Sequence, residues 1–404
     1  MVKHPLLILA YYYPPDVESG AARPYRLAKY LQRLGHPVDV IAPGIYDKPV
    51  TEGIVHRVRG EREKHPRKDL PALIERGFRK LLFSHDPGIT WVPRAVSYAS
   101  RWARNGSRPV LLSTAPPATT HLAALWLKRR YGMPWIADFR DPMFGNPFRP
   151  RSQNVDARIE PFIFRHADAV IANTDTVAEM WKERYPQWKQ KIHLLWNGFD
   201  PEEVLEARPI PPHHDQKVLS HVGVIYGERD PSPLLIAFDR LVSQGVLDPR
   251  KVRIQLVGPM MLKLEKEGTI LQRLKSQGCL EIVNKRIPQA EAQQIITIAD
   301  YLLLLDVTNQ EKGLQVPAKL FEYIRIGRPV LACTIRHSPV DRILAQSGLP
   351  VVCLYSGDSG EEMGRKLASL FELPTEPVSP SDWFQTTFDG MNQAKFVSGL
   401  MGSL

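Results

Sequence analysis

Three charged side chains in the second half of the chain are of types that can bind phosphate and hydroxyl groups. Arg229 lies in a loop after an expected strand, and Lys319 lies at the start of an expected helix that Pro317 opens. Both cations can reach phosphate oxygens. Glu322 follows Lys319 by three residues and shares its helix face, where a carboxylate can accept both hydroxyls of a ribose. Spacing alone favours the simpler interpretation that such side chains are solvated on the surface.

A second candidate for phosphate binding lies near the N-terminus. The first expected strand ends in a loop rich in tyrosine and proline, and Gly20 and Ala21 stand where the first helix is expected to begin, with Pro24 in its first turn. Unpaired backbone N–H groups at a helix N-terminus attract an anion. An ordinary strand-to-helix loop is the simpler interpretation of the glycine alone. The G-x-G-x-x-G spacing is missing, which disfavours a nicotinamide cofactor.

Two aspartates flank Arg140 at the end of the expected strand 135–138. Open α/β sheets bind ligands at the carboxyl ends of their strands. Asp141, and after it Asp138, are therefore candidates for orienting a substrate hydroxyl or for stabilising positive charge on a sugar ring. An Asp–Arg–Asp ion-pair network that braces the loop explains the same residues almost equally well.

Contacts with an acceptor are expected in the first half of the chain. Trp91 can stack on a sugar ring, although it can equally belong to the core. Ser113 ends an expected strand and His121 lies on the helix that follows, where a packed histidine is the simpler interpretation. The basic stretch 56–80 is either a solvated loop and helix or, with Arg79 and Lys80 beside apolar residues, a contact with a membrane that carries a lipid-linked acceptor.

These candidates must be positioned by strands and helices that alternate along nearly the whole chain, a pattern typical of parallel sheets with crossover helices. The clearest helix is 24–34, and others are expected near Pro231, Gln289, Pro317 and Gly360. The expected strands are 6–12, 38–42, 55–59, 109–113, 135–138, 169–173, 192–196, 218–224, 252–257, 280–283, 301–305, 329–333 and 350–354.

A polar, proline-rich stretch, 207–216, interrupts this alternation and predicts a linker between two domains. We expect an N-terminal domain at 1–205 and a C-terminal domain at 206–381; the resemblance described below implies that the first binds an acceptor and the second a nucleotide sugar. The last residues, 382–404, predict a helix that packs back on the first domain. Two domains also agree with a length of 404 residues, which exceeds what one average core supports.

Composition narrows the possible partners and the compartment. The net charge of +10 favours an anionic partner, such as a nucleotide phosphate, a lipid phosphate or a membrane surface, but the glycine–aromatic pattern of RNA-binding strands is missing and no nucleic-acid partner is expected. The three cysteines have no spacing that predicts a disulfide framework or a zinc site. Because no apolar run is long enough to span a bilayer, we expect a cytoplasmic protein, with the inner face of the cell membrane as a possible location.

Several segments resemble family 4-like bacterial glycosyltransferases, which have the GT-B fold. The resemblance lies in the run from Tyr11 to Pro43 and continues, in the order expected of the family, over most of the chain. The other matching segments are STAPP at 113–117, WIADFRDP at 135–142, NGFD at 197–200, GVIYGERD at 223–230, VPAKLFEY at 316–323 and GRPV at 327–330.

The resemblance implies two Rossmann-like, doubly wound domains that face each other across a cleft. It also implies a retaining transfer that needs no metal or other cofactor, from a nucleoside-diphosphate sugar held mainly by the C-terminal domain. Arg229 and Lys319 then match the residues that clamp the diphosphate, and Glu322 matches the second glutamate of the E-x7-E motif. Leu314 stands where the first glutamate is usual, and Val224 stands where many relatives have an arginine.

We therefore expect a glycosyltransferase that moves a sugar to a saccharide or lipid-linked acceptor in surface polysaccharide or glycolipid synthesis. A GT-B-fold sugar-nucleotide epimerase would share the nucleotide site but needs acid and base carboxylates around the sugar. The departures at Leu314 and Val224 motivate a third possibility, a non-catalytic nucleotide-sugar-binding protein on the same scaffold.

Overall fold

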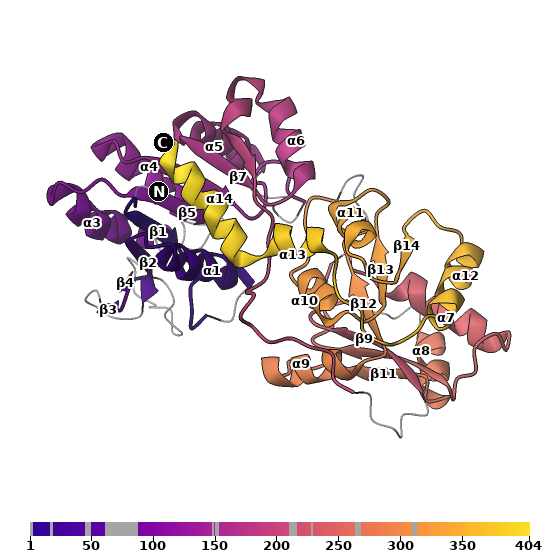
Figure 1. Ribbon diagram of the computed structural model, residues 1–404. Coiled ribbons are helices and arrows are strands. Elements are labelled where there is room, and N and C mark those ends of the chain that lie inside the picture. The colour runs from indigo at the N-terminus through magenta and orange to yellow at the C-terminus, as the bar shows by residue number, and fades with distance from the viewer. Residues whose placement is uncertain are drawn as a thin grey trace, which may run out of the picture. The chain divides into compact units, whose positions relative to one another are not determined.

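The chain forms two compact units (Figure 1). The computed structural model describes residues 3–16, 19–44, 50–60, 88–147, 149, 153–209, 216–227, 229–262, 268–308 and 313–404. Unit 1 comprises Met1–Asp200 and Phe388–Leu404, and unit 2 comprises Pro201–Thr387. The chain thus first passes from unit 1 to unit 2 after Asp200, slightly before the expected domain boundary at 205.

Unit 1 is built on a sheet in which all pairings are parallel except that of β3 with β4. Runs such as LLILA in β1 are buried at every position, which is typical of strands covered on both faces. In the order of the sheet, the strands are β3 (Val50–Glu52), β4 (Val55–Arg59), β2 (Val38–Gly44), β1 (Leu6–Ala10), β5 (Val110–Ala115), β6 (Trp135–Phe139), β7 (Ala169–Ala172) and β8 (Ile192–Leu194).

The helices of unit 1 cover this sheet, and one of them comes from the far end of the chain. They are α1 (Ser19–Arg33), α3 (Trp91–Arg104), α4 (Thr119–Tyr131), α5 (Gln153–His166), α6 (Asp175–Arg184) and α14 (Gly390–Gly402), with a short 3-10 helix at Pro186–Lys191. The expected start of α1 at Pro24 is wrong, because the helix begins at Ser19 and Pro24 lies inside it.

The C-terminal segment forms two helices instead of the one expected over 382–404. The break falls at Asp389, whose side chain accepts a hydrogen bond from Asn392 N and caps α14. Val397 and Met401 of α14 are buried in the core of unit 1 with Leu27 of α1, and the two helices lie side by side in Figure 1. The C-terminal helix therefore completes the N-terminal unit.

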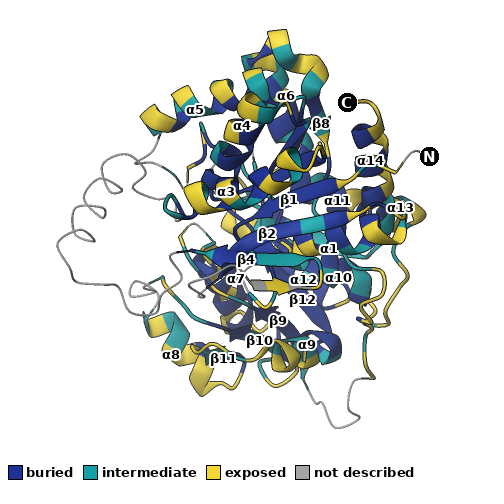
Figure 2. Ribbon diagram, turned by 90° about the vertical axis from the view of Figure 1, so that its left-hand side faces the viewer, coloured by how far each residue is buried: buried dark blue, intermediate teal, exposed yellow. Residues whose placement is uncertain are grey.

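Unit 2 has a parallel sheet of six strands in the order β11 (Leu280–Val283), β10 (Val252–Val257), β9 (Lys217–Val222), β12 (Tyr301–Leu305), β13 (Val330–Thr334) and β14 (Val351–Tyr355). The helices are α7 (Ser232–Ser243), α8 (Gly268–Ser276), α9 (Gln289–Ile298), α10 (Lys319–Ile326), α11 (Pro339–Gln346), α12 (Gly360–Leu370) and α13 (Asp382–Phe388). Strands such as β1 and β9 are buried, whereas the outward faces of the helices are exposed (Figure 2).

Every strand expected from the sequence is present, and β3, α8 and α11 are additions. In each sheet the winding reverses next to the first strand of the unit. In unit 1 the reversal lies between β1 and β5, and in unit 2 it lies between β9 and β12. Such reversal points are where doubly wound sheets bind ligands, beyond the carboxyl ends of the strands.

Candidate functional site

The reversal point of unit 2 opens because two neighbouring strands separate. Strand β9 pairs with β10 from Lys217 to Val222, but it pairs with β12 only at Leu219 and Ser220. Beyond Ser220 the strands β9 and β12 are no longer paired. Doubly wound sheets bind ligands beyond such a point, in the region that we call the crevice, and there Gly223, which follows β9, packs on Lys319 at the start of α10.

His221 lies where the two strands separate. Its side chain is only 3% exposed, and Nδ1 donates a hydrogen bond to the carbonyl of Leu303 in β12 at 3.0 Å. Burial, together with the positive charges of Lys319 and Arg229, lowers the pKa of His221 to about 3. The imidazole is therefore neutral at pH 7, and Nε2, which has no partner among the described residues, presents a lone pair.

Lys319 packs directly on Gly223. A Cβ atom at residue 223 would lie 1.9 Å from Nζ of Lys319 and would displace that ammonium, and the φ of 152° favours glycine there. Lys319 is the first residue of α10, and Nζ makes no hydrogen bond with the described residues. Burial lowers the pKa of Lys319, Glu322 opposes this effect, and Arg229 adds to it. A half-buried cation without a hydrogen-bonding acceptor among the described residues is suited to receive a phosphate.

Glu322 and Arg229 share the electrostatic environment of Lys319, as the sequence predicts. Burial raises the pKa of the half-buried Glu322, and Lys319, one helical turn earlier, lowers it. The guanidinium of Arg229 lies 5.1 Å from the ring centre of Tyr226, and its charge acts on Lys319, His221 and Asp306 alike. The three predicted donor residues of unit 2 are thus brought together.

Asp306, which the sequence analysis did not single out, follows β12 on the other side of the crevice. It is 3% exposed, and it accepts hydrogen bonds from Oγ1 of Thr334 and from the backbone N–H of Val307, each at 2.8 Å. Burial raises the pKa of Asp306 to about 6, against the opposing effects of Thr334, Val307 and Arg229. One sequence pattern could have identified Asp306: it is an acid that directly follows the apolar run LLLL, as Asp138 follows an apolar strand.

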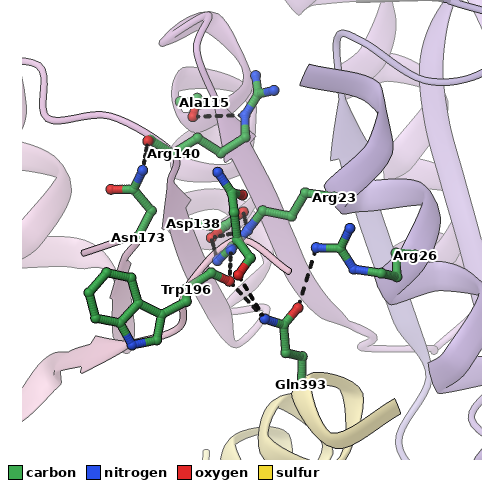
Figure 3. Close-up of polar contacts among 9 residues, drawn as sticks. Arg23, Arg26, Ala115, Asp138, Arg140, Asn173, Trp196 and Gln393 are labelled. Carbon is green, nitrogen blue, oxygen red and sulfur yellow. Dashed lines mark hydrogen bonds and ion pairs between the residues drawn. The ribbon is translucent and has the colours of Figure 1, made fainter. Parts of the chain in front are cut away.

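In unit 1 Asp138 pairs with Arg23, while the charges of Asp141 and Asp138 both raise the pKa of Arg140 against the effect of burial. Asp138 is 0% exposed and forms a bidentate ion pair with Arg23 of α1, with distances from 2.6 to 3.1 Å (Figure 3). Nη1 of Arg23 also donates to the carbonyl of Trp196 at 2.7 Å. The carboxylate of Asp138 is therefore committed to holding α1 against the sheet, and we do not retain it as a catalytic candidate.

Arg140 lies at the reversal point of unit 1 instead. Its Nε donates to the carbonyl of Ala115 at 3.2 Å (Figure 3). Its backbone N–H donates to the same carbonyl at 2.8 Å, and Nη2 donates to the carbonyl of Pro116. A Cβ atom at Gly20 would lie 2.1 Å from Nη1 of Arg140, so the start of α1 packs on this guanidinium. The roles of Gly20, of its buried neighbour Ala21 and of the half-buried Asp141 stay predictions.

The three residues proposed for acceptor contact lie in the core of unit 1, and this prediction needs correction. Trp91, Ser113 and His121 are all fully buried. Oγ of Ser113 lies 2.7 Å from Nδ1 of His121 and accepts a hydrogen bond from Nε1 of Trp135 at 2.7 Å, while Trp91 packs edge-on against Tyr11. These side chains stabilise the interior and do not line a surface. Residues 61–80 of the basic stretch, with Arg79 and Lys80, lie outside the described residues.

Two general features concern ions and membranes. Among the residues that the structure describes, no group of three or more His, Cys, Asp or Glu side chains could hold a metal ion. No described helix is long and apolar enough to cross a bilayer.

Comparison with known proteins gives one family and a set of similar folds. Residues 21–203 match the family model Glycosyltransferase Family 4. Sucrose-phosphate synthase from Thermosynechococcus elongatus is similar in structure with a TM-score of 0.64 at 13% identity, covering 99% of both chains. HepE from Anabaena in complex with UDP has a TM-score of 0.61 at 14% identity, covering 99% of this chain and 100% of that one.

The lipopolysaccharide outer core galactosyltransferase WaaB has a TM-score of 0.61 at 13% identity, covering 99% of both chains. At such identities the likeness shows the fold, which is the two-domain α/β architecture of GT-B proteins. No curated protein matches the chain in sequence at a significant level.

A structural role for Asp138 predicts a loss of stability. Asp138→Asn leaves the buried charge of Arg23 incompletely compensated and is expected to lower the free energy of unfolding of unit 1 by about 3 kcal/mol. Urea unfolding followed by tryptophan fluorescence reports this unit, because Trp383 is the one tryptophan outside it. Glu179→Gln, which removes an exposed ion pair with Lys182, is the control and should change stability by less than about 0.5 kcal/mol. Unchanged stability of Asp138→Asn would restore a role in substrate contact.

The raised pKa of Asp306 predicts a stability difference that depends on pH. Because the folded state favours the protonated acid, the wild type loses stability relative to Asp306→Asn as the pH rises from about 4 through about 6. The variant should gain about 3 kcal/mol in unit 2 at pH 8 and almost nothing at pH 4, as measured by scanning calorimetry.

A carboxylate whose pKa is lowered instead of raised provides the control for this titration. Hydrogen bonds from the Arg250 side chain and backbone lower the pKa of the exposed Asp248, so Asp248→Asn should lose stability at high pH instead of gaining it. A difference between wild type and Asp306→Asn that is equal at pH 4 and pH 8 would contradict the assignment.

Proposed function

Because this chain is a family 4-like glycosyltransferase, we propose that it transfers a sugar from a nucleoside-diphosphate sugar bound in unit 2 to a saccharide or lipid-linked acceptor bound by unit 1. The observation that carries the proposal is the ammonium of Lys319, which packs on Gly223 at the reversal point of the unit 2 sheet. HepE has been solved with UDP and with UDP-glucose, which makes uridine nucleotides the first donors to test.

The charges around the crevice support binding of a diphosphate. His221 is neutral at pH 7, so Lys319 and Arg229 are the cations of this cluster. Both can pair with diphosphate oxygens, and Glu322, one turn into α10, can accept the two hydroxyls of the ribose. Leu314 cannot replace the carboxylate that relatives of this family usually have there, so recognition of the sugar depends on other groups.

In the proposed reaction, the oxygen of an acceptor hydroxyl forms a bond to the anomeric carbon as the bond from that carbon to the diphosphate oxygen breaks. The hydroxyl proton leaves with the diphosphate. Lys319 and Arg229 stabilise the negative charge that develops on this leaving group, which is the largest electrostatic demand of the step. These two cations support a transfer that needs no metal, and the family resemblance supports retention of configuration at the anomeric carbon.

The proposed biological setting is synthesis of surface polysaccharide or glycolipid. The net charge of +10 supports contact with an anionic membrane face, where a lipid-linked acceptor would be found. We propose the cytoplasmic side of the cell membrane as the location.

Nucleotide binding should depend on α10. We expect one of UDP, GDP or ADP to bind the full-length protein, and we expect Lys319→Met and Glu322→Gln to weaken its binding by at least about tenfold each, since each removes a contact with a charged group. Isothermal titration calorimetry measures both. Gly223→Ala tests the same site by geometry, because its Cβ atom would displace Nζ of Lys319.

A pair with the same three-residue spacing supplies the control. Glu179→Gln and Lys182→Met alter an exposed pair on α6 of unit 1 and should leave nucleotide affinity unchanged. If no nucleotide binds, or if the α10 variants bind it as well as the wild type does, the proposed donor site is wrong.

Turnover separates transfer from the two alternative functions. With the sugar conjugate of the bound nucleotide and a membrane or saccharide extract as acceptor, we expect labelled sugar to enter the acceptor while free nucleoside diphosphate is released. The rate should be unchanged by a chelator, since Lys319 and Arg229 stabilise the leaving group. Conversion of the donor to its epimer without an acceptor would favour an epimerase, and binding without any turnover would favour a binding protein.

A further inference from the structure

A pocket in unit 1 lies apart from the residues discussed so far. It has a volume of about 690 Å³ and is bounded by α1 on one side and by β4 with the turn that precedes it on the other. Tyr13 and Pro14, which follow β1 at the reversal point of this sheet, form one end of the pocket. The pocket therefore begins at the edge of the sheet where doubly wound units bind ligands.

Three cations line this pocket from different positions in the fold. Arg57 reaches it from β4, is only 7% exposed, and donates hydrogen bonds to the carbonyls of Pro14 and Pro43. Lys29 lies in the middle of α1, where its ammonium pairs with Asp200 at 2.6 Å. Arg33 lies exposed at the end of α1. A pocket with this composition favours an anionic ligand.

Two tyrosines add an aromatic surface to the same pocket. The rings of Tyr13 and Tyr25 meet edge to face, with their centres 6.0 Å apart. Tyr13 is buried, whereas Tyr25 is 43% exposed. An exposed aromatic face beside hydrogen-bonding groups is suited to a ligand with one apolar and one polar side, such as a pyranose ring.

Charge and ring surface together define the ligand class. We propose that this pocket binds an anionic saccharide, a sugar that carries a phosphate or a carboxylate, with the charged group near Arg33 and Arg57 and the ring on Tyr25. Phosphates and carboxylates are both recognised by the planar guanidinium group, so the two chemistries share one site. This inference rests on the proposed function, in which the bound saccharide is the acceptor of the transferred sugar.

The test uses the full-length protein and defined small probes. Isothermal titration with glucose 6-phosphate, N-acetylglucosamine 1-phosphate and glucuronate should detect binding of at least one anionic sugar. Glucose and inorganic phosphate, each lacking one half of the recognised chemistry, should bind at least about tenfold more weakly. The response of glucuronate relative to the sugar phosphates distinguishes a carboxylate ligand from a phosphate ligand.

Exposed side chains provide variants that leave the fold intact. Arg33→Gln and Tyr25→Leu should each weaken the anionic sugar by about tenfold, because each removes one half of the contact. Arg130→Gln is the matched control, since Arg130 is also exposed in the last turn of a helix and stacks on Tyr131 at 5.4 Å as Arg33 stacks on Tyr30 at 5.2 Å.

The outcomes separate this inference from the donor site. The affinity of these variants for UDP should be unchanged. If no nucleotide binds the wild type, the proposed donor site is rejected, but the pocket assignment is unaffected. The pocket assignment is overturned if none of the three anionic sugars binds, if Arg33→Gln and Tyr25→Leu bind as the wild type does, or if inorganic phosphate binds as tightly as the sugars.

Discussion

The separation of β9 from β12 is the constraint on which the candidate donor site depends. A doubly wound sheet must reverse its winding once, and at that point the two neighbouring strands send their connections to opposite faces. Here the pairing of β9 with β12 ends at Ser220, and Gly223 follows β9 while Asp306 follows β12. The ammonium of Lys319 from α10 packs on Gly223, where a Cβ atom would displace it.

Burial sets the charge balance of this crevice. It holds His221 neutral, weakens the proton affinity of Lys319 and raises that of Asp306 and Glu322. In the proposed donor site, the negative charge of a diphosphate would compensate Lys319 and Arg229 at once. A protein that only needed stability would gain by replacing such groups with apolar ones, which is why their clustering argues for a ligand.

Unit 1 uses its buried charges differently. The ion pair of Arg23 with Asp138 joins α1 to β6, and Arg23 continues to the carbonyl of Trp196, which also accepts a hydrogen bond from Gln393 of α14 (Figure 3). The segment that leaves the unit and the helix that returns to it are thus fixed by one polar cluster. The reversal point of this sheet is occupied by Arg140, whose guanidinium is held by backbone carbonyls and faces Gly20.

The sequence by itself determined the alternation of strands and helices and the position of nearly every strand, because periodicity is a property of neighbouring residues, while the grouping of Arg229 with Lys319 and Glu322 came from the family resemblance. Only the tertiary structure decided that Asp138 pairs with Arg23, which is 115 residues away, and that Trp91, Ser113 and His121 are buried. It also showed where His221 and Asp306 lie and revealed the pocket of unit 1 that Arg57 lines. These features depend on which strands lie side by side and where they part, and no local pattern encodes that.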